Sequence, residues 1–322
     1  MVKSALLAAA ALQLVIPVCA LATEFPHQQP ITLIVGFGPG GSTDIIARFL
    51  APKLKAALGQ TIVVDNRPGA SGIIATEAML RAPADGYTLF ACTNGVLTTH
   101  KYLFKQLKFD AAKDILPVTQ IASVPYVLLA HPSVPANTPA EFVALAKKEP
   151  GKIMYGSAGV GSAGHLAAEM FSSKVGINMN HVPYKGSGQA MSDLVAGTIN
   201  VAFDQQSTVA GFLAGDRLKA IAVASKERLP SLPKVPTFNE AGIAFEAASW
   251  TGICIRSGTP APIVDKISRA VREVMAQQDV RKRFEELGIQ PKSTTPQEFQ
   301  TLVANDRDRM GKAITAIGIR PE

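Results

Sequence analysis

"ITLIVGFGPGGSTD", residues 31–44, is the stretch that decides the fold. A β-branched apolar run over residues 31–35 leads into a glycine-rich loop. Apolar residues then recur at helical spacing from Ile45 to Leu58. The stretch therefore predicts a strand, a loop and a helix in direct succession.

The same unit occurs again in both halves of the chain. "TIVVDN" leads through "RPGASG" to "IIATEAMLRA", and "KIMYG" leads through "SAGVGSAG" to "HLAAEMFSSKV". Strands that alternate with helices predict a parallel α/β sheet. We expect two α/β lobes, with the chain crossing between them near residues 123–128 and 247–252. The C-terminal helices should return to cover the first lobe, with no strand between the last two.

The bulk composition fits an exported globular protein. The chain has 322 residues, of which 47% are hydrophobic and 18% charged, and its length suggests about two domains. Residues 1–22 have the pattern of an export signal: one charge at Lys3, a short apolar run, and small residues up to Ala22. An uncleaved anchor and a lipid anchor at Cys19 are the alternatives.

The charge and cysteine patterns exclude several classes of function. The net charge of +7 is scattered, and the densest basic cluster, residues 280–287, alternates with acids, so no nucleic-acid partner is expected. No C-x-x-C or H-E-x-x-H motif occurs, so no metal site is expected. Cys92 and Cys254 could pair in an oxidising compartment, but both lie in apolar runs and are interpreted as small core residues.

Gly36, Gly38 and Gly41 match the dinucleotide fingerprint G-x-G-x-x-G, and a second apolar run ends in an acid, Asp65. Pro39 nevertheless offers no N–H to a pyrophosphate. The helix is expected to begin after Gly41, with Ser42 or Thr43 as its N-cap, and Asp65 is expected to cap a turn. The sequence therefore argues against a nucleotide.

A glycine loop that enters a helix presents free N–H groups and the positive end of the helix dipole, which together favour an anion. Three loops have this form: residues 36–44, 67–72 and 156–165. Two such loops facing each other would hold a carboxylate at each end of a small molecule. The alternative is that the glycines only make tight turns, and for residues 67–72 we favour that alternative.

A catalytic site has weak support. Ser157 and Ser162 precede His165, but no G-x-S-x-G motif is present, and consecutive placement on one helix turn does not create a catalytic triad. His165 is interpreted either as a hydrogen-bond donor to a ligand or as a packed polar residue. An exported hydrolase for a small acidic substrate stays as the alternative function, and a structural or adhesive protein as a third.

Several stretches together resemble the Bug-type extracytoplasmic solute receptors of tripartite tricarboxylate transporters, over nearly all of the chain after the signal. The stretches are "FPHQQPITLIVGFGPGGSTDIIAR", "VVDNRPGASGIIATEAMLRAPADGYTLF", "HVPYKGSGQAMSDLVAGTINVAFD", "LKAIAVASKERLPSLPKVPTFNEAG" and "SGTPAPIVDKISRAV".

The resemblance implies a two-lobed α/β fold of the periplasmic-binding-protein type (type II), with the ligand in a cleft between lobes. It implies lobe 1 over residues 23–124 and 250–322 and lobe 2 over residues 125–249. It also implies a periplasmic, non-enzymatic receptor, monomeric and without a cofactor, that delivers a small carboxylate to the membrane subunits of the transporter.

The family pattern, carried over position by position, gives the candidate ligand-binding residues. They come from the first-lobe loop, from the segment after the third strand, from the second-lobe loop, and from two positions at the cleft floor or rim. The candidates are Phe37, Gly38, Gly40, Gly41, Ser42, Thr43, Asp44, Thr93, Ser157, Gly159, Ser162, His165, Tyr184, Lys185 and Asp204. Asn94 and Gly95 are adjacent to this set.

Overall fold

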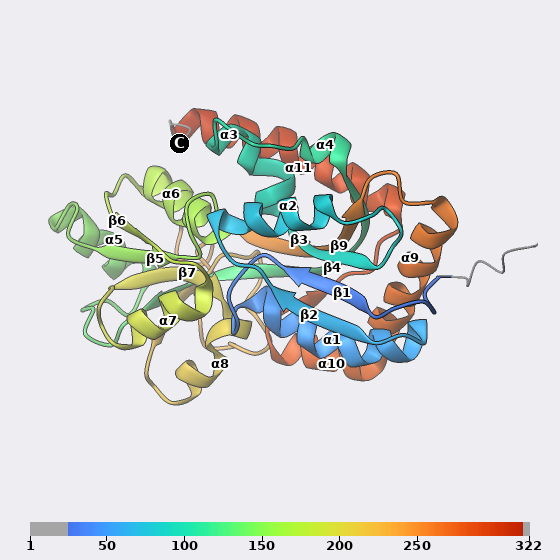
Figure 1. The fold of residues 1–322 in the computed structure, drawn as a ribbon. Helices are drawn as coiled ribbons and strands as arrows, with labels where there is room; N and C mark the ends of the chain where they lie inside the picture. Colours follow the sequence, from blue (N-terminus) through green and yellow to red (C-terminus); the bar gives the residue numbers. More distant parts are fainter. Residues whose placement is uncertain (1–24, 318–322) are drawn as a thin grey trace, which may run out of the picture.

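The computed structural model describes residues 25–317 and consists of two α/β lobes side by side (Figure 1). The expected export signal, residues 1–22, lies outside the described residues. The first lobe contains the strands of one end of a long curled sheet, and the second lobe those of the other end. The sheet order is β2-β1-β3-β9-β4-β7-β5-β6, with β10 and β8 also paired to β4.

The strands of the first lobe are both parallel and antiparallel. The expected parallel sheet is confirmed for β2, β1 and β3, but β9 is antiparallel to both β3 and β4. A short strand, β10, lies before the last helix, so the expectation of no strand there is wrong. The bounds are β1 (Ile31–Val35), β2 (Ile62–Asn66), β3 (Thr88–Thr93), β4 (Ile115–Ala130), β9 (Ala248–Arg256) and β10 (Gln290–Pro291).

The second lobe repeats this mixture. Strand β5 is parallel to β6 and β7, while β7 and β8 are antiparallel to β4. The bounds are β5 (Met154–Ser157), β6 (Asn180–Pro183), β7 (Val201–Gln205) and β8 (Lys219–Val223). Strand β4 therefore belongs to both lobes: its first part pairs with β9 and its last five residues pair with β7.

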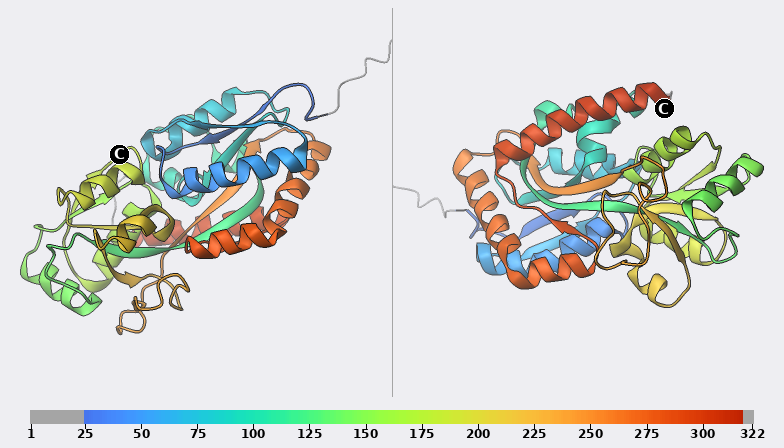
Figure 2. Two further views of the ribbon diagram at one scale, coloured as in Figure 1. Left: turned by 90° about the horizontal axis from the view of Figure 1, so that it is seen from below. Right: turned by 180° about the vertical axis from the view of Figure 1, so that it is seen from behind.

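Helices cover both faces of each part of the sheet (Figures 1 and 2). In lobe 1 one apolar core joins the sheet to α1, α9 and α10, and another joins it to α2, η2 and α11. The bounds are α1 (Ser42–Leu58), η1 (Ala70–Gly72), α2 (Ile73–Arg81), η2 (Gly95–Thr99), α3 (His100–Leu103), α4 (Ala111–Asp114), α9 (Ala261–Ala276), α10 (Gln278–Glu286) and α11 (Pro296–Ile317). The C-terminal helices thus return to lobe 1, as expected.

Lobe 2 has an aromatic core on one face of its sheet, where Phe171, Phe203 and Phe238 pack together, and an aliphatic core under α7 and α8 on the other. The helices of this lobe are α5 (Pro139–Lys148), α6 (Ala163–Val175), α7 (Ser187–Val195) and α8 (Gln206–Ala214).

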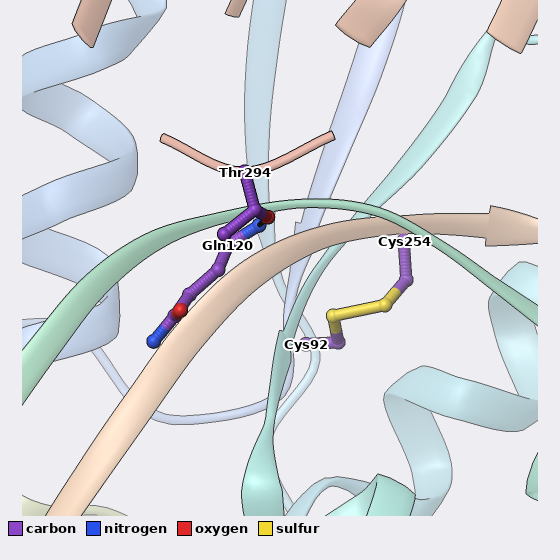
Figure 3. Close-up of a disulfide and its surroundings, with 4 residues drawn as sticks. All are labelled: Cys92, Gln120, Cys254 and Thr294. Carbon is purple, nitrogen blue, oxygen red and sulfur yellow. Dashed lines mark hydrogen bonds between the residues drawn. A yellow bond between two sulfur atoms is a disulfide. The ribbon is translucent and has the colours of Figure 1, made fainter. Parts of the chain in front are cut away.

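A disulfide joins Cys92 of β3 to Cys254 of β9 (Figure 3). The interpretation of these residues as unpaired core cysteines is therefore wrong. Both residues are fully buried, and the register pairs Cys254 with Phe90 and Cys92 with Gly252 on the neighbouring strand. The antiparallel pairing of β3 with β9 brings the two cysteines together across 162 residues of sequence, which spacing alone could not indicate.

Candidate functional site

A small cavity lies where the two lobes meet. The volume that the centre of a water molecule can occupy inside it is about 50 Å³. A single buried water needs roughly 10–15 Å³ on this measure, so the cavity takes a few waters or a small molecule. Among the described residues that line it, Asp204 is the only charged side chain. The lining residues are Phe37, Gly41, Ser42, Thr43, Ser71, Thr93, Asn94, Gly95, Tyr126, Ala158, Ser162, Ala163, Gly164, Ser187, Phe203, Asp204, Gln205 and Ser249.

The first-lobe loop, residues 36–41, is held in place by the carboxylate of Asp44. Asp44 is only 3% exposed and accepts hydrogen bonds from the Gly40 N–H at 3.0 Å, from Arg48 Nε at 2.9 Å and from Asn66 Nδ2 at 2.9 Å. Gly40 has a φ of +82°, which favours glycine at the turn. The acid thus orders the loop and the N-terminus of α1, instead of lining the cavity.

Helix α1 begins directly after Gly41, as expected, but its N-cap differs from the prediction. Its N-cap is Gly41, with an extended backbone at φ −77°, and Ser42 is the first helical residue, so the assignment of Ser42 or Thr43 as N-cap is wrong. Ser42 and Thr43 both line the cavity. The first turn of a 17-residue helix therefore faces the cavity from lobe 1.

The second-lobe loop, residues 157–162, leads into α6 in the same way. Ser162 is the N-cap, and its hydroxyl accepts from the His165 N–H. Gly159 and Gly161 both have a positive φ, at +115° and +74°. Ser162, Ala163 and Gly164 line the cavity, so the N-terminus of the 13-residue α6 faces it from lobe 2.

His165 is a packed polar residue in this structure. It is buried, its Nδ1 accepts from the Gly161 N–H at 3.2 Å, and its ring lies 4.2 Å from that of His181. Burial lowers its pKa, which the nearby Glu169 partly offsets. The His165 ring therefore supports the second-lobe loop through Gly161 and does not line the cavity.

His181 is a supporting residue that sequence reasoning did not single out. Its Nε2 lies 2.7 Å from Ser157 Oγ, and that hydroxyl also accepts from the Gly159 N–H at 3.2 Å. Burial, with a contribution from His165, lowers the pKa of His181 to about 3. A neutral His181 thus fixes Ser157, and through it the loop. Its place in a strand far along the chain left no local signal of this contact.

Asp204, at the end of β7, is the ionisable group of the cavity. It is 5% exposed, and burial raises its pKa to about 6, although a hydrogen bond from the Gln205 N–H at 2.7 Å favours the charged form. No lysine or arginine among the described lining residues compensates its charge. An ionised Asp204 is therefore costly in the closed cavity.

The predicted site residues fall into two groups. The candidates that line the cavity are Phe37, Gly41, Ser42, Thr43, Thr93, Ser162 and Asp204. The candidates that support the loops or lie outside the cavity wall are Gly38, Gly40, Asp44, Ser157, Gly159, His165, Tyr184 and Lys185. Of these, Gly159, Tyr184 and Lys185 line a separate, open surface depression next to the loops.

The cavity also takes residues from segments that we did not include. Ser71 comes from the loop over residues 67–72, which we interpreted as a tight turn; it lines the cavity, and its hydroxyl donates to the Val160 carbonyl of lobe 2. Tyr126, Phe203 and Ser249 enter from the crossing strands and from β7. Asn94 and Gly95 reach the cavity directly after Thr93, as their adjacency suggested.

Two further properties of the chain bear on function. Over residues 25–317, none of the helices has the length and apolar character needed to cross a bilayer. The same residues contain no group of three or more His, Cys, Asp or Glu side chains gathered as a metal site.

The comparisons with known proteins identify the family. The family model of the tripartite tricarboxylate transporter family receptor matches residues 46–319, so the chain belongs to this receptor family. Protein BugT of Bordetella pertussis is 33% identical to the chain over 294 residues, which cover 91% of this chain and 90% of BugT. The resemblance to Bug-type receptors is thereby confirmed.

Solved structures agree with this assignment. R. palustris Rpa4515, solved with adipate, has a TM-score of 0.90 and 34% identity, and the match covers 93% of this chain and 100% of that one. MatC from Rhodopseudomonas palustris, solved with bound malate, has a TM-score of 0.86 and 31% identity over 90% of this chain and 100% of MatC. The predicted two-lobed fold is confirmed. The hydrolase alternative finds no support.

Proposed function

We propose that this chain is an exported receptor that captures a small carboxylate in the inter-lobe cavity and delivers it to the membrane subunits of a tripartite tricarboxylate-type transporter. The proposal includes no catalytic step and no cofactor. The adipate and malate of the related structures indicate the size and class of the ligand, a short acid with a carboxylate at each end.

The observation that carries the proposal is the meeting of two helix N-termini at one cavity. Helix α1 of lobe 1 and α6 of lobe 2 both present their first turns to it. Helix N-termini bear a partial positive charge and free N–H groups, so they favour an anion without a cationic side chain. Because the two termini belong to different lobes, a ligand with two carboxylates bridges the lobes.

Bridging gives the mechanism of capture. The ligand contacts both lobes only in the closed form, so it stabilises that form by its differential contacts. The hinge consists of β4 and the start of β9, which pair at Pro125 and Ala248 where the chain passes between lobes. We assign lobe 1 to residues 23–124 and 250–322 and lobe 2 to residues 125–249.

Export and assembly complete the proposal. The signal over residues 1–22 sends the chain to the periplasm and is cleaved near Ala22, and the receptor works as a monomer. N-terminal sequencing of the protein purified from the periplasm is expected to start at Thr23. A protein that keeps residues 1–22 and sediments with membranes would mean an anchored receptor.

Titration calorimetry of the exported protein with adipate, malate, citrate, NAD and ATP tests the function. We expect binding of at least one acid and none of the nucleotides. Gly41→Val should abolish acid binding while the protein stays folded, because the added side chain enters the cavity wall beside Ser187, 3.9 Å from the new Cβ.

Arg67→Ala tests whether a cationic side chain holds the ligand. Arg67 pairs with Asp65 at 2.7 Å and does not line the cavity. We expect this variant to keep most of the affinity. A loss of more than about 3 kcal/mol, the size expected when a buried charge pair is broken, would mean that a cation holds the ligand.

A further inference from the structure

The backbones of the two lobes approach each other closely beside the cavity. Gly186 and Gly188 of lobe 2 flank Ser187, which lines the cavity, and both face the first-lobe loop. A Cβ on Gly186 would lie 2.9 Å from the Gly38 nitrogen, and a Cβ on Gly188 would lie 2.8 Å from the Pro39 carbonyl oxygen. Neither separation is tolerated by real Cβ atoms, so side chains at these positions exclude the observed closure.

The folding of lobe 2 itself does not need these glycines. Gly186 has a φ of 175°, which is extended backbone open to any residue, and Gly188 is the second residue of α7. At each position, the three heavy atoms nearest to an added Cβ all belong to the first-lobe loop, residues 38–40. Alanine is also the better helix former at position 188. The requirement for glycine therefore comes from the other lobe.

Other glycines near the cavity differ in this respect. A Cβ on Gly164 would lie 2.7 Å from the Phe203 carbonyl oxygen, which is in the same lobe, so the fold requires that glycine. Gly159 approaches Ser71 of lobe 1, but its φ of +115° strains any substitution before closure is considered. Unlike these two glycines, Gly186 and Gly188 can be substituted without strain inside lobe 2, and the added side chain then obstructs only the closure of the lobes.

We propose that Gly186 and Gly188 are the positioning residues of ligand capture: the missing side chains let lobe 2 close onto the backbone of the first-lobe loop and seal the cavity. This rests on the proposed function in one respect, that closure is what holds the ligand. Independent contacts accompany the closed form. Ser71 bonds to Val160 across the lobes, and Leu166 of α6 packs with Leu103 and Met310 of lobe 1.

The first test is Gly188→Ala, with Gly211→Ala as control. Gly211 lies in α8 of the same lobe, and a Cβ there meets nothing within 4 Å. For Gly188→Ala we expect a melting temperature without ligand no lower than that of the wild type, and an acid affinity reduced at least tenfold. Gly186→Ala should repeat the loss, and Gly211→Ala should bind normally.

The second test reads closure without any ligand. Ala70→Cys and Val160→Cys place one thiol on each lobe, at positions that line the same surface depression. A short bis-maleimide joins them only when the lobes are closed, so its coupling rate follows the closed population. We expect Gly188→Ala to slow coupling at least tenfold and Gly211→Ala to leave it unchanged.

The two readouts separate the possible failures. If Gly188→Ala couples and binds like the wild type, the first-lobe loop yields to the methyl group and the proposal is overturned. If the variant couples slowly but no protein binds an acid, the role of the glycines stands and the proposed function fails. Slow coupling together with weakened binding supports both.

Discussion

Both lobes present a glycine-rich loop and a helix N-terminus to the cavity, but they stabilise these parts with different chemistry. In lobe 1 a disulfide joins the neighbouring strands β3 and β9, and the carboxylate of Asp44, paired with Arg48 and hydrogen-bonded to Asn66, orders the loop. In lobe 2 the described residues contain no disulfide, and neutral partners, Ser157 and His181, order the loop. The same local geometry of the loops therefore depends on an ion pair with its hydrogen bonds in lobe 1 and on neutral hydrogen bonds in lobe 2.

Each lobe also buries one carboxylate beside the cavity, with opposite consequences. Asp44 has three donors, one of them an arginine, whereas Asp204 lies among neutral groups and has a pKa raised to about 6 by burial. A buried charge stabilises only when its partners replace the lost water. The lobes should therefore respond in opposite directions when their buried acid is neutralised.

Removal of the disulfide should have the largest effect. Cys92→Ala with Cys254→Ala opens a covalent loop of 162 residues, for which chain entropy gives a loss of about 5 kcal/mol. For lobes of this size the melting temperature should fall by about 10 °C. Hydrogen exchange should then accelerate in β1, β3 and β9 while β5 and β7 keep their protection. Equal acceleration in both lobes would show that the disulfide stabilises the molecule as a whole.

Asp204→Asn should give the second largest effect, and it should be stabilising. The folded-state pKa of Asp204 is raised from the usual 3.8 to about 6, so its contribution to stability is fully present below pH 3.8 and is lost as pH rises through 6. At pH 8 the ionised acid costs about 3 kcal/mol, which the amide avoids. We expect a higher melting temperature than the wild type at pH 8, and a difference that shrinks toward pH 4. A variant that is less stable at pH 8 would mean that the donors around the carboxylate, the Gln205 N–H among them, outweigh the cost of its burial.

Asp44→Asn is the matched substitution in lobe 1 and should act in the other direction. The amide presents an NH2 group to donors that now face a carboxylate, so a charged hydrogen-bond network is lost at a cost of about 2 kcal/mol. The measurement is thermal unfolding at pH 8, side by side with Asp204→Asn. If both variants shift the melting temperature in the same direction, partner chemistry does not distinguish the two acids.

Sequence patterns were sufficient for what is encoded locally. The strand over residues 31–35, the helix after it and the loop over residues 157–162 follow from apolar periodicity and glycine placement, which act over a few residues. Residues at the loop–helix junctions, such as Ser42, Thr43 and Ser162, could therefore be placed at the cavity from the sequence and the family resemblance together.

The rest depends on contacts between distant segments. Tyr126 and Ser249 reach the cavity because β4 and β9 cross between lobes in antiparallel pairing, which alternation of strands and helices does not indicate. The disulfide and the close packing of the His165 and His181 rings likewise depend on tertiary register. The role of Asp44 was also hidden, because a ligand contact and a loop-ordering contact use the same residue type at a helix N-terminus.

The smallest predicted effect concerns a third acid, Asp65, which lies near the first-lobe loop and sharpens the comparison because it is only partly buried. It lies on β2, one strand away from the loop, and its carboxylate pairs with Arg67 at 2.7 Å, with side chains 34% and 46% exposed. Exposed pairs of this kind contribute little. Asp65→Ala should therefore lower stability by only about 0.5 kcal/mol.

Acid binding should be almost unchanged in Asp65→Ala, since Asp65 does not line the cavity.

The same variant tests the nucleotide alternative that the glycine pattern raises. In a dinucleotide site Asp65 would bind a ribose, and its loss would remove nucleotide binding. We expect calorimetry to find no binding of NAD or ATP to either protein, because Pro39 lacks a donor. Nucleotide binding that disappears in Asp65→Ala would place a dinucleotide site on this loop. If Asp65→Ala lowers the free energy of unfolding as much as Asp44→Asn does, the deeper burial of Asp44 does not explain the difference between Asp44 and Asp65.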